Sequence, residues 1–198
     1  SNRVFKVLDT NEFVNSDVDL MMNEVKGHFK FDRIHFSYID EEPVLNDINF
    51  EVQAGQTLAL VGATGSGKSS IINLILRFYN VDSGTILLDG KDIMQYNIQS
   101  LRSHIALVLQ DVFLFSDTIY KNIVLDKEIP IKEVRDAAKA IGLEDFIEQL
   151  PGGYHYNVRE RGVMLSAGQR QLIAFLRAYV CNPSVLILDE ATSSVDIQ

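Results

Sequence analysis

Apolar and polar side chains alternate along two neighbouring stretches near the start of the chain. The first runs from His28 to Tyr38, with a slip in the alternation near Arg33, and the second covers residues 44–52. Between them, Glu41-Glu42-Pro43 is a turn signal. An apolar residue at every second position is typical of a strand with one half-buried face. We therefore predict an antiparallel sheet in this part of the chain.

Short apolar runs and helical periodicities follow in turn. Apolar runs predict further strands at residues 57–61, 85–88, 105–109 and 185–188. Helical spacing of apolar residues predicts helices over residues 70–78, 98–103, 117–150 and 166–180. The last run, Val185–Leu188, is apolar throughout, which predicts a buried central parallel strand. A mixed sheet, a helical insertion and a return to a buried strand together predict an α/β core that carries a helical lobe.

The first 24 residues have a different character. Residues 3–9 have a helical pattern, and a polar stretch rich in Asn and Asp follows. This composition is typical of a linker rather than a core. We therefore place a linker at residues 1–24, one domain at residues 25–198, and its helical subdomain at about residues 111–179.

A glycine-rich segment joins the predicted strand at 57–61 to the next helix. Gly62, four intervening residues and Gly67-Lys68-Ser69 match the P-loop pattern. Backbone N–H groups can approach a phosphate chain only where no Cβ blocks them, and a helix dipole adds roughly 0.3–1 kcal/mol. Lys68 adds a charge and Ser69 a Mg²⁺ ligand. The alternative, a turn with an incidental surface lysine, is disfavoured by the flanking strand and helix.

Two further segments carry candidate chemistry. Ser166 and Gln169 have the spacing of a capping box, so this helix start is either only a well-capped end or a second anion site. Asp189 and Glu190 follow the strand at 185–188, at the end where open α/β sheets bind ligands. Adjacent residues on a strand point in opposite directions, so one acid can approach Mg²⁺ while the other reaches a water. The alternative is two solvated loop charges.

Composition excludes several classes of function. The 198 residues carry a formal net charge of -9, which argues against nucleic-acid binding because no basic face is available. The single cysteine, Cys181, excludes an internal disulfide and a cysteine-based zinc site. No apolar run reaches the length that spans a bilayer. The composition is that of an ordinary soluble domain.

These motifs, in this order, resemble the nucleotide-binding domain of an ATP-binding-cassette (ABC) transporter, most closely the exporter type. Residues 62–69 resemble the Walker A motif, and residues 186–190 resemble Walker B with its catalytic glutamate. Leu165-Ser166-Ala167-Gly168-Gln169 is similar to the family signature Leu-Ser-Gly-Gly-Gln. The resemblance covers residues 29–196. It implies a P-loop NTPase (RecA-like) core with an antiparallel β subdomain and an inserted α-helical subdomain.

The same resemblance implies ATP and Mg²⁺ as ligands and assigns residues to them. Tyr38 corresponds to the aromatic residue that stacks on adenine, and residues 193–196 to the D-loop. Without the resemblance, Tyr38 and Gln110 would be ordinary strand residues. The implied catalytic residues are Lys68, Gln110 and Glu190, and the implied Mg²⁺ ligands are Ser69, Gln110 and Asp189. The implied nucleotide contacts are Tyr38, Gly62, Thr64, Gly65, Ser66, Gly67, Lys68, Ser69, Ser70, Ser166, Gly168 and Gln169.

The function implied is a Mg²⁺-dependent ATPase that powers export by nucleotide-driven dimerisation. Its partners would be a second nucleotide-binding domain, identical or different, in a head-to-tail dimer, and transmembrane domains in the same polypeptide. It would lie at the cytoplasmic face of the cell membrane. One alternative is a binding-only or weakly hydrolysing half-site of a mixed transporter pair. Another is a soluble, non-transport ABC ATPase, which would need a coiled-coil insertion and basic surface that this sequence lacks.

Three features depart from the family pattern. Ala167 replaces a glycine of the signature, which adds a methyl group where a γ-phosphate would approach. Arg159 stands where a glycine is usual in the loop that senses the membrane domains. The chain ends before the family's switch histidine. None of the four histidines takes that place, and they are His28, His35, His104 and His155.

Overall fold

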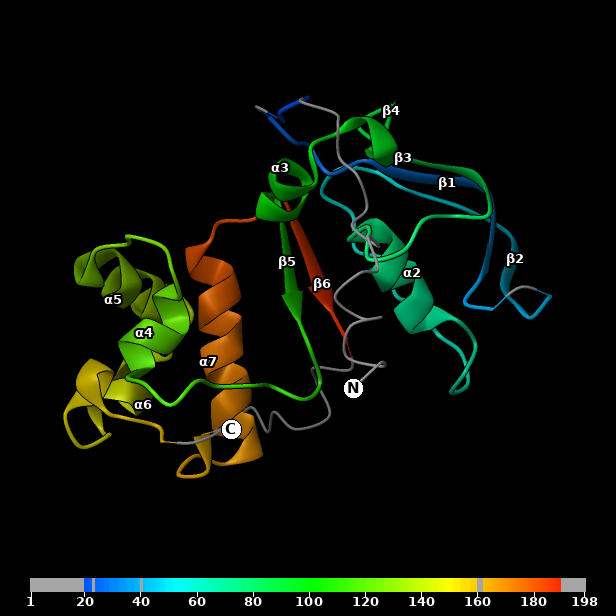
Figure 1. The fold of residues 1–198 in the computed structure, drawn as a ribbon. Helices are drawn as coiled ribbons and strands as arrows, with labels where there is room; N and C mark the ends of the chain where they lie inside the picture. Colours follow the sequence, from blue (N-terminus) through cyan, green and yellow to red (C-terminus); the bar gives the residue numbers. More distant parts are fainter. Residues whose placement is uncertain (1–19, 23, 40, 160–161, 190–198) are drawn as a thin grey trace, which may run out of the picture. The chain divides into compact units, whose positions relative to one another are not determined.

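The computed structural model describes residues 20–22, 24–39, 41–159 and 162–189. The chain divides into two compact units, residues 1–103 and residues 104–198, which are treated separately (Figure 1). Most of the predicted linker, the predicted catalytic Glu190 and the predicted D-loop lie outside the described residues. Within the described residues, no helix has the length and apolar character needed to cross a membrane.

A four-stranded antiparallel sheet forms most of the first unit, with strand order β2-β1-β3-β4. The pairing of β1 shifts register near Arg33 on both sides, between Phe31 and Ile34 toward β2 and between Asp32 and His35 toward β3. Arg33 has a positive φ of 51°. A bulge therefore accounts for the slip in the sequence pattern, and the predicted antiparallel sheet is confirmed. The strands are β1 (Phe29–Ser37), β2 (Pro43–Val52), β3 (Ser83–Leu88) and β4 (Lys91–Asp92).

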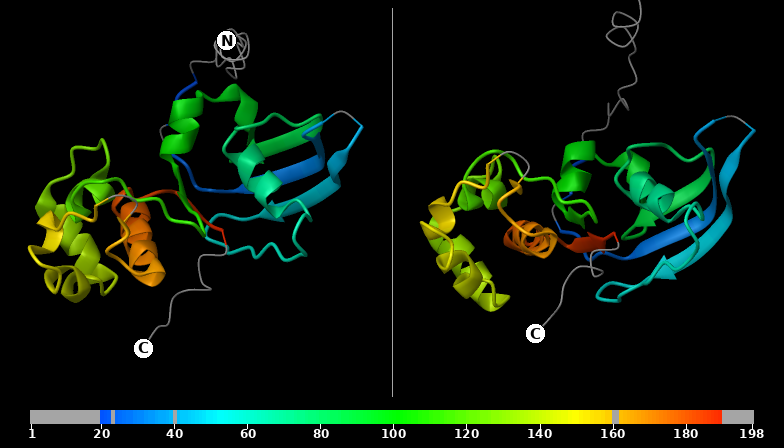
Figure 2. Two further views of the ribbon diagram at one scale, coloured as in Figure 1. Left: turned by 60° about the horizontal axis from the view of Figure 1, so that its bottom comes forward. Right: turned by 90° about the horizontal axis from the view of Figure 1, so that it is seen from below.

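Three helical segments complete the first unit: α2 (Lys68–Ile75), η1 (Ile93–Gln95) and α3 (Ile98–Ser103). Figure 2 shows α2 beside the sheet. The helix predicted at 70–78 thus starts and ends earlier than expected. Its end is a Schellman motif, in which Arg77 N–H donates to Leu74 O and Phe78 N–H donates to Asn73 O, while Arg77 has a φ of 52°. Arg102 adds donors to the carbonyls of Leu76 and Arg77, which anchors the C-terminal end of α2.

The strand predicted at residues 57–61 is not formed. These residues have no regular secondary structure, and Val61 is 92% exposed. A strand is stabilised by hydrogen bonds to a neighbouring strand, and none of β1 to β4 pairs with this run. The apolar pattern alone therefore predicted this element wrongly.

The second unit is mainly helical. Its helices are α4 (Ile119–Val124), α5 (Ile131–Ala140), α6 (Glu144–Glu148), η2 (Gly153–His155) and α7 (Ala167–Val180). Both views in Figures 1 and 2 place α7 between the strands of this unit and the shorter helices. Its apolar side chains, including Ile173 and Leu176, enter the core of the helical group, while Ala174 and Ala178 pack on Val108 of a strand. The predicted helix at 166–180 is thus confirmed as the central element of this unit.

Two parallel strands, β5 (Ile105–Val108) and β6 (Val185–Leu188), form the sheet of the second unit. Their parallel pairing agrees with the sequence prediction. The prediction of full burial was wrong, because Leu186 is 52% and Leu188 is 45% exposed. Leu186 lies at an open groove of about 760 Å³ that α5 and α7 also line, so one face of the strand is uncovered among the described residues.

Candidate nucleotide site

The lysine of the P-loop is held over its own loop. Lys68 Nζ donates to the carbonyl oxygens of Gly62, at 2.7 Å, and of Ala63, at 3.1 Å. These are two of the three hydrogen bonds that an ammonium group can donate. Among the described residues, Lys68 forms no ion pair with a carboxylate. The positive charge is therefore placed at the loop without a counter-charge there, as an anion-binding site requires.

Close contacts explain why glycine occupies two positions of the loop. Gly67 has a φ of 88°, and a Cβ atom there would lie 2.5 Å from Leu45 Cδ2. A Cβ atom at Gly62 would lie 2.5 Å from Ser66 Oγ. The left-handed conformation of Gly67 favours glycine where the loop turns into α2, and at both positions an added Cβ would force Leu45 or Ser66 to move.

The starts of α2 and α7 differ in their free donors. At α2 the cap residue is Gly67, and no side chain accepts a hydrogen bond from the first turn. At α7 a complete capping box is present, because Ser166 Oγ accepts from Gln169 N–H and Gln169 Oε1 accepts from Ser166 N–H. The open N–H groups of α2, together with Lys68, are the donor set that a phosphate chain needs. The residues of this loop thus fit a triphosphate.

Tyr38 lies against the same helix. Its hydroxyl donates to Ser70 Oγ at 3.1 Å and accepts from Asn73 Nδ2 at 3.0 Å. Tyr38 is 45% exposed. The structure therefore brings an accessible aromatic ring and the phosphate-binding loop together within the first unit, through Ser70.

Two of the residues assigned to Mg²⁺ lie at one edge of the second unit's sheet. Val108 and Leu188 are aligned in the parallel pair, and Asp189 N–H donates to Val108 O at 2.9 Å. Gln110 follows the end of β5 and is exposed. The third, Ser69, belongs to the first unit. Within the described residues no three His, Cys, Asp or Glu side chains are placed to hold a metal ion, so phosphate and water oxygens would have to complete a Mg²⁺ site.

The loop after Gln110 is anchored by a buried residue that sequence patterns did not single out. Asn122 is fully buried in α4. Its side-chain Oδ1 accepts from Phe115 N–H at 2.8 Å, and its Nδ2 donates to Phe115 O and to Thr118 O, each at 3.0 Å. Arg177 of α7 donates from Nε to the carbonyl of Asn122 at 2.8 Å. Burial lowers the pKa of the Arg177 guanidinium, which nevertheless stays charged. A polar residue on the apolar side of a predicted helix was the available signal.

Two of the three departures from the family pattern, Arg159 and Ala167, lie among the described residues. Arg159 has a φ of 57°, in the left-handed region, and its N–H donates to Asn157 Oδ1 at 2.8 Å. A glycine is the usual residue in this conformation, which agrees with the family pattern. Ala167 is the first residue of α7 and is exposed. Alanine is favoured over glycine in a helix, so Ala167 needs no special backbone conformation.

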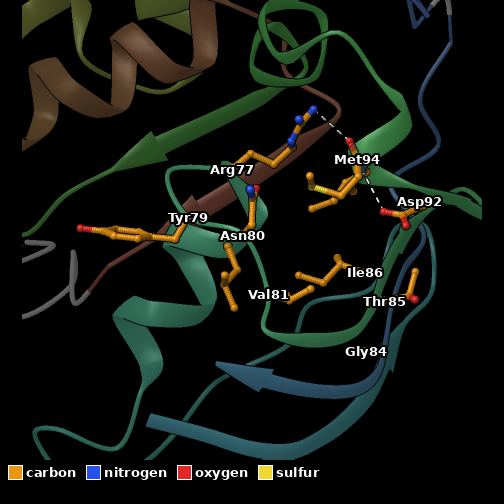
Figure 3. A pocket seen from close by; sticks show the side chains of 11 residues that line it. Arg77, Tyr79, Asn80, Val81, Gly84, Thr85, Ile86, Asp92 and Met94 are labelled. Carbon is orange, nitrogen blue, oxygen red and sulfur yellow. Dashed lines mark hydrogen bonds between the residues drawn. The ribbon is translucent and has the colours of Figure 1, made fainter. Parts of the chain in front are cut away.

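A small cavity lies elsewhere in the first unit and contains none of the predicted nucleotide contacts. It has a volume of about 90 Å³, and Arg77, Val81, Ile86 and Met94 are among its lining residues (Figure 3). The buried Arg77 guanidinium donates to the carbonyl oxygens of Ile93, at 3.2 Å, and Tyr96, at 2.7 Å. Arg77 therefore joins the end of α2 to η1, which is a structural role.

The family model described as ABC transporter matches residues 45–193. The chain is 46% identical over its whole length to the ABC transporter ATP-binding protein YknV of Bacillus subtilis, covering 33% of that protein. Over 89% of its length it is also 46% identical to YgaD of the same organism, whose name places it among multidrug export ATP-binding/permease proteins and of which it covers 31%.

A solved structure also resembles the chain. It is a bacterial Atm1-family ABC exporter with ATP bound, at 39% sequence identity and a TM-score of 0.91, covering 99% of this chain and 35% of that one. The chain thus spans about a third of the length of the relatives that it matches.

Proposed function

This chain belongs to the ABC transporter family as an exporter-type ATPase domain, and we propose on that premise that residues 62–70 and Tyr38 bind the ATP it hydrolyses. One observation carries the proposal. The hydroxyl of the exposed Tyr38 ring is bonded to Ser70, on the helix that begins at the P-loop. A stacking surface for a base and a cradle for phosphates therefore belong to one unit.

The phosphate-binding role follows from the donors already described. Lys68 would give its charge to the β- and γ-phosphates, and the open N–H groups of the first turn of α2 would bind the remaining oxygens. Thr64, Gly65 and Ser66 lie in the same loop and are also proposed to contact the phosphates, although the Ser66 N–H donates to Ala63 O at 3.1 Å. Phosphoryl transfer depends mainly on positioning and on neutralising charge, so these contacts would supply much of the catalysis.

Oxygen atoms of Ser69, Gln110 and Asp189 are the proposed ligands of a magnesium ion. When bound, Mg²⁺ would neutralise charge on the phosphates. Glu190 is proposed to orient and polarise the attacking water, and Gln110 is proposed to contact the same water. The parallel alignment of β5 and β6, which puts Gln110 and Asp189 at one edge, supports this assignment.

We further propose that the domain closes as a head-to-tail dimer with a second nucleotide-binding domain. In that dimer Ser166, Gly168 and Gln169 of one copy would approach the ATP of the other. Closure and release would move transmembrane domains of the same polypeptide, at the cytoplasmic face of the cell membrane, and so drive export. The combined ATP-binding and permease name of YgaD, and the one third of its length that this chain spans, support such an arrangement.

The test replaces the proposed catalytic carboxylate in the intact protein. Glu190→Gln should retain ATP binding and lose most ATPase turnover. It should also accumulate as an ATP-bound dimer, detected by gel filtration in detergent. Glu128→Gln, at an exposed position outside the predicted site, is the matched control and should leave turnover unchanged. Normal turnover in Glu190→Gln would refute its role, and absence of any ATPase activity in the unmodified protein would refute the function.

A further inference from the structure

The hydroxyl of Tyr38 has two partners on one helix. It donates to Ser70 Oγ at 3.1 Å and accepts from Asn73 Nδ2 at 3.0 Å. Ser70 and Asn73 are three residues apart on α2, which puts their side chains on the same face of the helix. Both the donor and an acceptor site of the phenol are therefore bonded to the helix that begins at the P-loop.

Neighbouring rings constrain Tyr38 from the side. The ring of Phe36 lies 4.7 Å from that of Tyr38 at an interplanar angle of 80°, and the ring of Tyr79 lies 4.9 Å away at 88°. Figure 3 shows that the Tyr79 side chain extends away from the cavity-lining side chains of Val81 and Ile86. Edge-on contacts of this kind are favourable and hold a ring at a defined angle.

Despite these contacts, 45% of the Tyr38 side chain is exposed. A phenol that is free to turn about its side-chain torsions would present its face to a base only part of the time. Two hydrogen bonds at its tip and two nearly perpendicular neighbouring rings remove that freedom before a ligand arrives. Preorganisation of this kind raises affinity because less entropy is lost on binding.

We propose that Asn73 is a positioning residue for the nucleotide base. Through the Tyr38 hydroxyl, its amide fixes the aromatic ring relative to the phosphate-binding loop, so that one purine nucleoside triphosphate can use both surfaces. This inference rests on the proposed function of the site. It goes further because it assigns a role in base binding to a residue outside the P-loop that would touch neither base nor phosphate.

A role in base positioning predicts different effects on a ligand with a base and on one without. Loss of the Asn73 amide should weaken ATP binding by about threefold to tenfold, the range that one net hydrogen bond corresponds to. It should leave the affinity for inorganic tripolyphosphate unchanged, because that ligand has no base. Alanine is a better helix former than asparagine, so Asn73→Ala does not weaken α2 through helix propensity.

The experiment measures equilibrium binding of Mg-ATP and of Mg-tripolyphosphate to the intact protein by calorimetry. Asn73→Ala is compared with Tyr38→Phe, which keeps the ring and removes the hydroxyl, and with the double variant. Because both single changes break the same bond, the double variant should bind ATP as Tyr38→Phe does. Asn73→Gln, which restores an amide donor, should recover part of the affinity. Asn80→Ala, at an exposed position after α2, is the control and should match the unmodified protein.

Selective loss of ATP affinity in Asn73→Ala would support the proposal. Equal losses for ATP and tripolyphosphate would overturn it, since Asn73 would then act on the loop as a whole. Unchanged ATP affinity would also overturn it. If the unmodified protein bound tripolyphosphate as tightly as ATP, the proposed role in base positioning would be refuted, while the phosphate site would stand. If the unmodified protein bound neither ligand, the proposed function would be refuted as well.

Discussion

The Nε atom of Arg177 donates to the main-chain carbonyl oxygen of Asn122 at 2.8 Å, which ties α7 to α4. Asn122 in turn bonds the main chain of Phe115 and Thr118 with its side chain. The helix that carries the signature sequence and the loop that follows Gln110 are therefore joined through one buried asparagine.

Asn122→Ala should lower the free energy of unfolding by about 1–3 kcal/mol, because it removes three side-chain hydrogen bonds and leaves the part-buried Phe115 N–H without its acceptor. Urea unfolding of the intact domain, followed by circular dichroism, measures the effect. Asn46→Ala, at an exposed position on β2, should change stability by less than about 0.5 kcal/mol. Equal stability of the two variants would contradict the structural role of Asn122.

Changes at Ser166 separate helix capping from nucleotide contact. Ser166→Ala removes the cap of α7 and should cost about 1 kcal/mol of stability. Ser166→Asp keeps a capping oxygen and adds negative charge where the partner's γ-phosphate is proposed to lie, so stability should be retained while ATP-induced dimerisation is lost. Thermal unfolding and gel filtration with ATP check the two effects. An aspartate variant that dimerised normally would exclude a phosphate contact at this position.

In the loop between η2 and α7, replacing one residue by glycine should stabilise the fold, and replacing one existing glycine should destabilise it. Arg159 has a positive φ, so Arg159→Gly should stabilise the fold by up to about 1 kcal/mol. Gly162 also has a positive φ, and an added Cβ would lie 2.9 Å from Leu114 Cδ1, so Gly162→Ala should destabilise. Chemical denaturation of both variants should give shifts of opposite sign. Shifts of the same sign would contradict the left-handed conformation of Arg159.

Tyr154 makes stability depend on alkaline pH. Burial, and then its hydrogen bond to Glu144, raises the pKa of the Tyr154 hydroxyl above the ordinary value of about 10. Above that pH the unfolded chain loses a proton that the folded protein keeps, so the unfolding free energy should fall by up to about 1.4 kcal/mol per pH unit. Below pH 10 the contribution is fully present.

The measurement is the pH dependence of urea unfolding between pH 8 and 11 for the unmodified protein and for Tyr154→Phe. Other tyrosines contribute to both curves, including Tyr96, whose pKa is also raised by burial. The difference between the curves isolates Tyr154, and the variant should have the shallower decline. Parallel curves would contradict the shift.

Sequence patterns predicted those elements whose stability is local. The alternation in β1 and β2, including the slip at Arg33, was visible because successive residues of a strand point to opposite faces of the sheet. The fold class, an ABC ATPase domain with an antiparallel sheet and inserted helices, is confirmed by the match to the family model and to the solved exporter. The capping box at Ser166 was likewise a local signal.

Features that depend on distant parts of the chain were not predictable. Residues 57–61 have the composition of a strand, but a strand also needs a hydrogen-bonding neighbour, which composition does not reveal. The burial of Leu186 was overestimated for the same reason. Asn73 was missed because its role comes from a partner 35 residues away, namely Tyr38. The side-chain partners of Asn122, the main chains of Phe115 and Thr118, are close in sequence, but the full burial of Asn122 was not visible in the sequence. The roles of the site residues themselves stay predictions.

The central claim is that the loop at Gly62–Ser69 binds the phosphates of ATP through Lys68. Its most direct test is the ATP affinity of the intact protein and of Lys68→Ala, with Lys91→Ala, at an exposed position on β4, as the control. Loss of one charge-assisted contact should weaken ATP binding by about tenfold or more in Lys68→Ala, and Lys91→Ala should bind normally. Equal ATP affinity in all three proteins would contradict the claim.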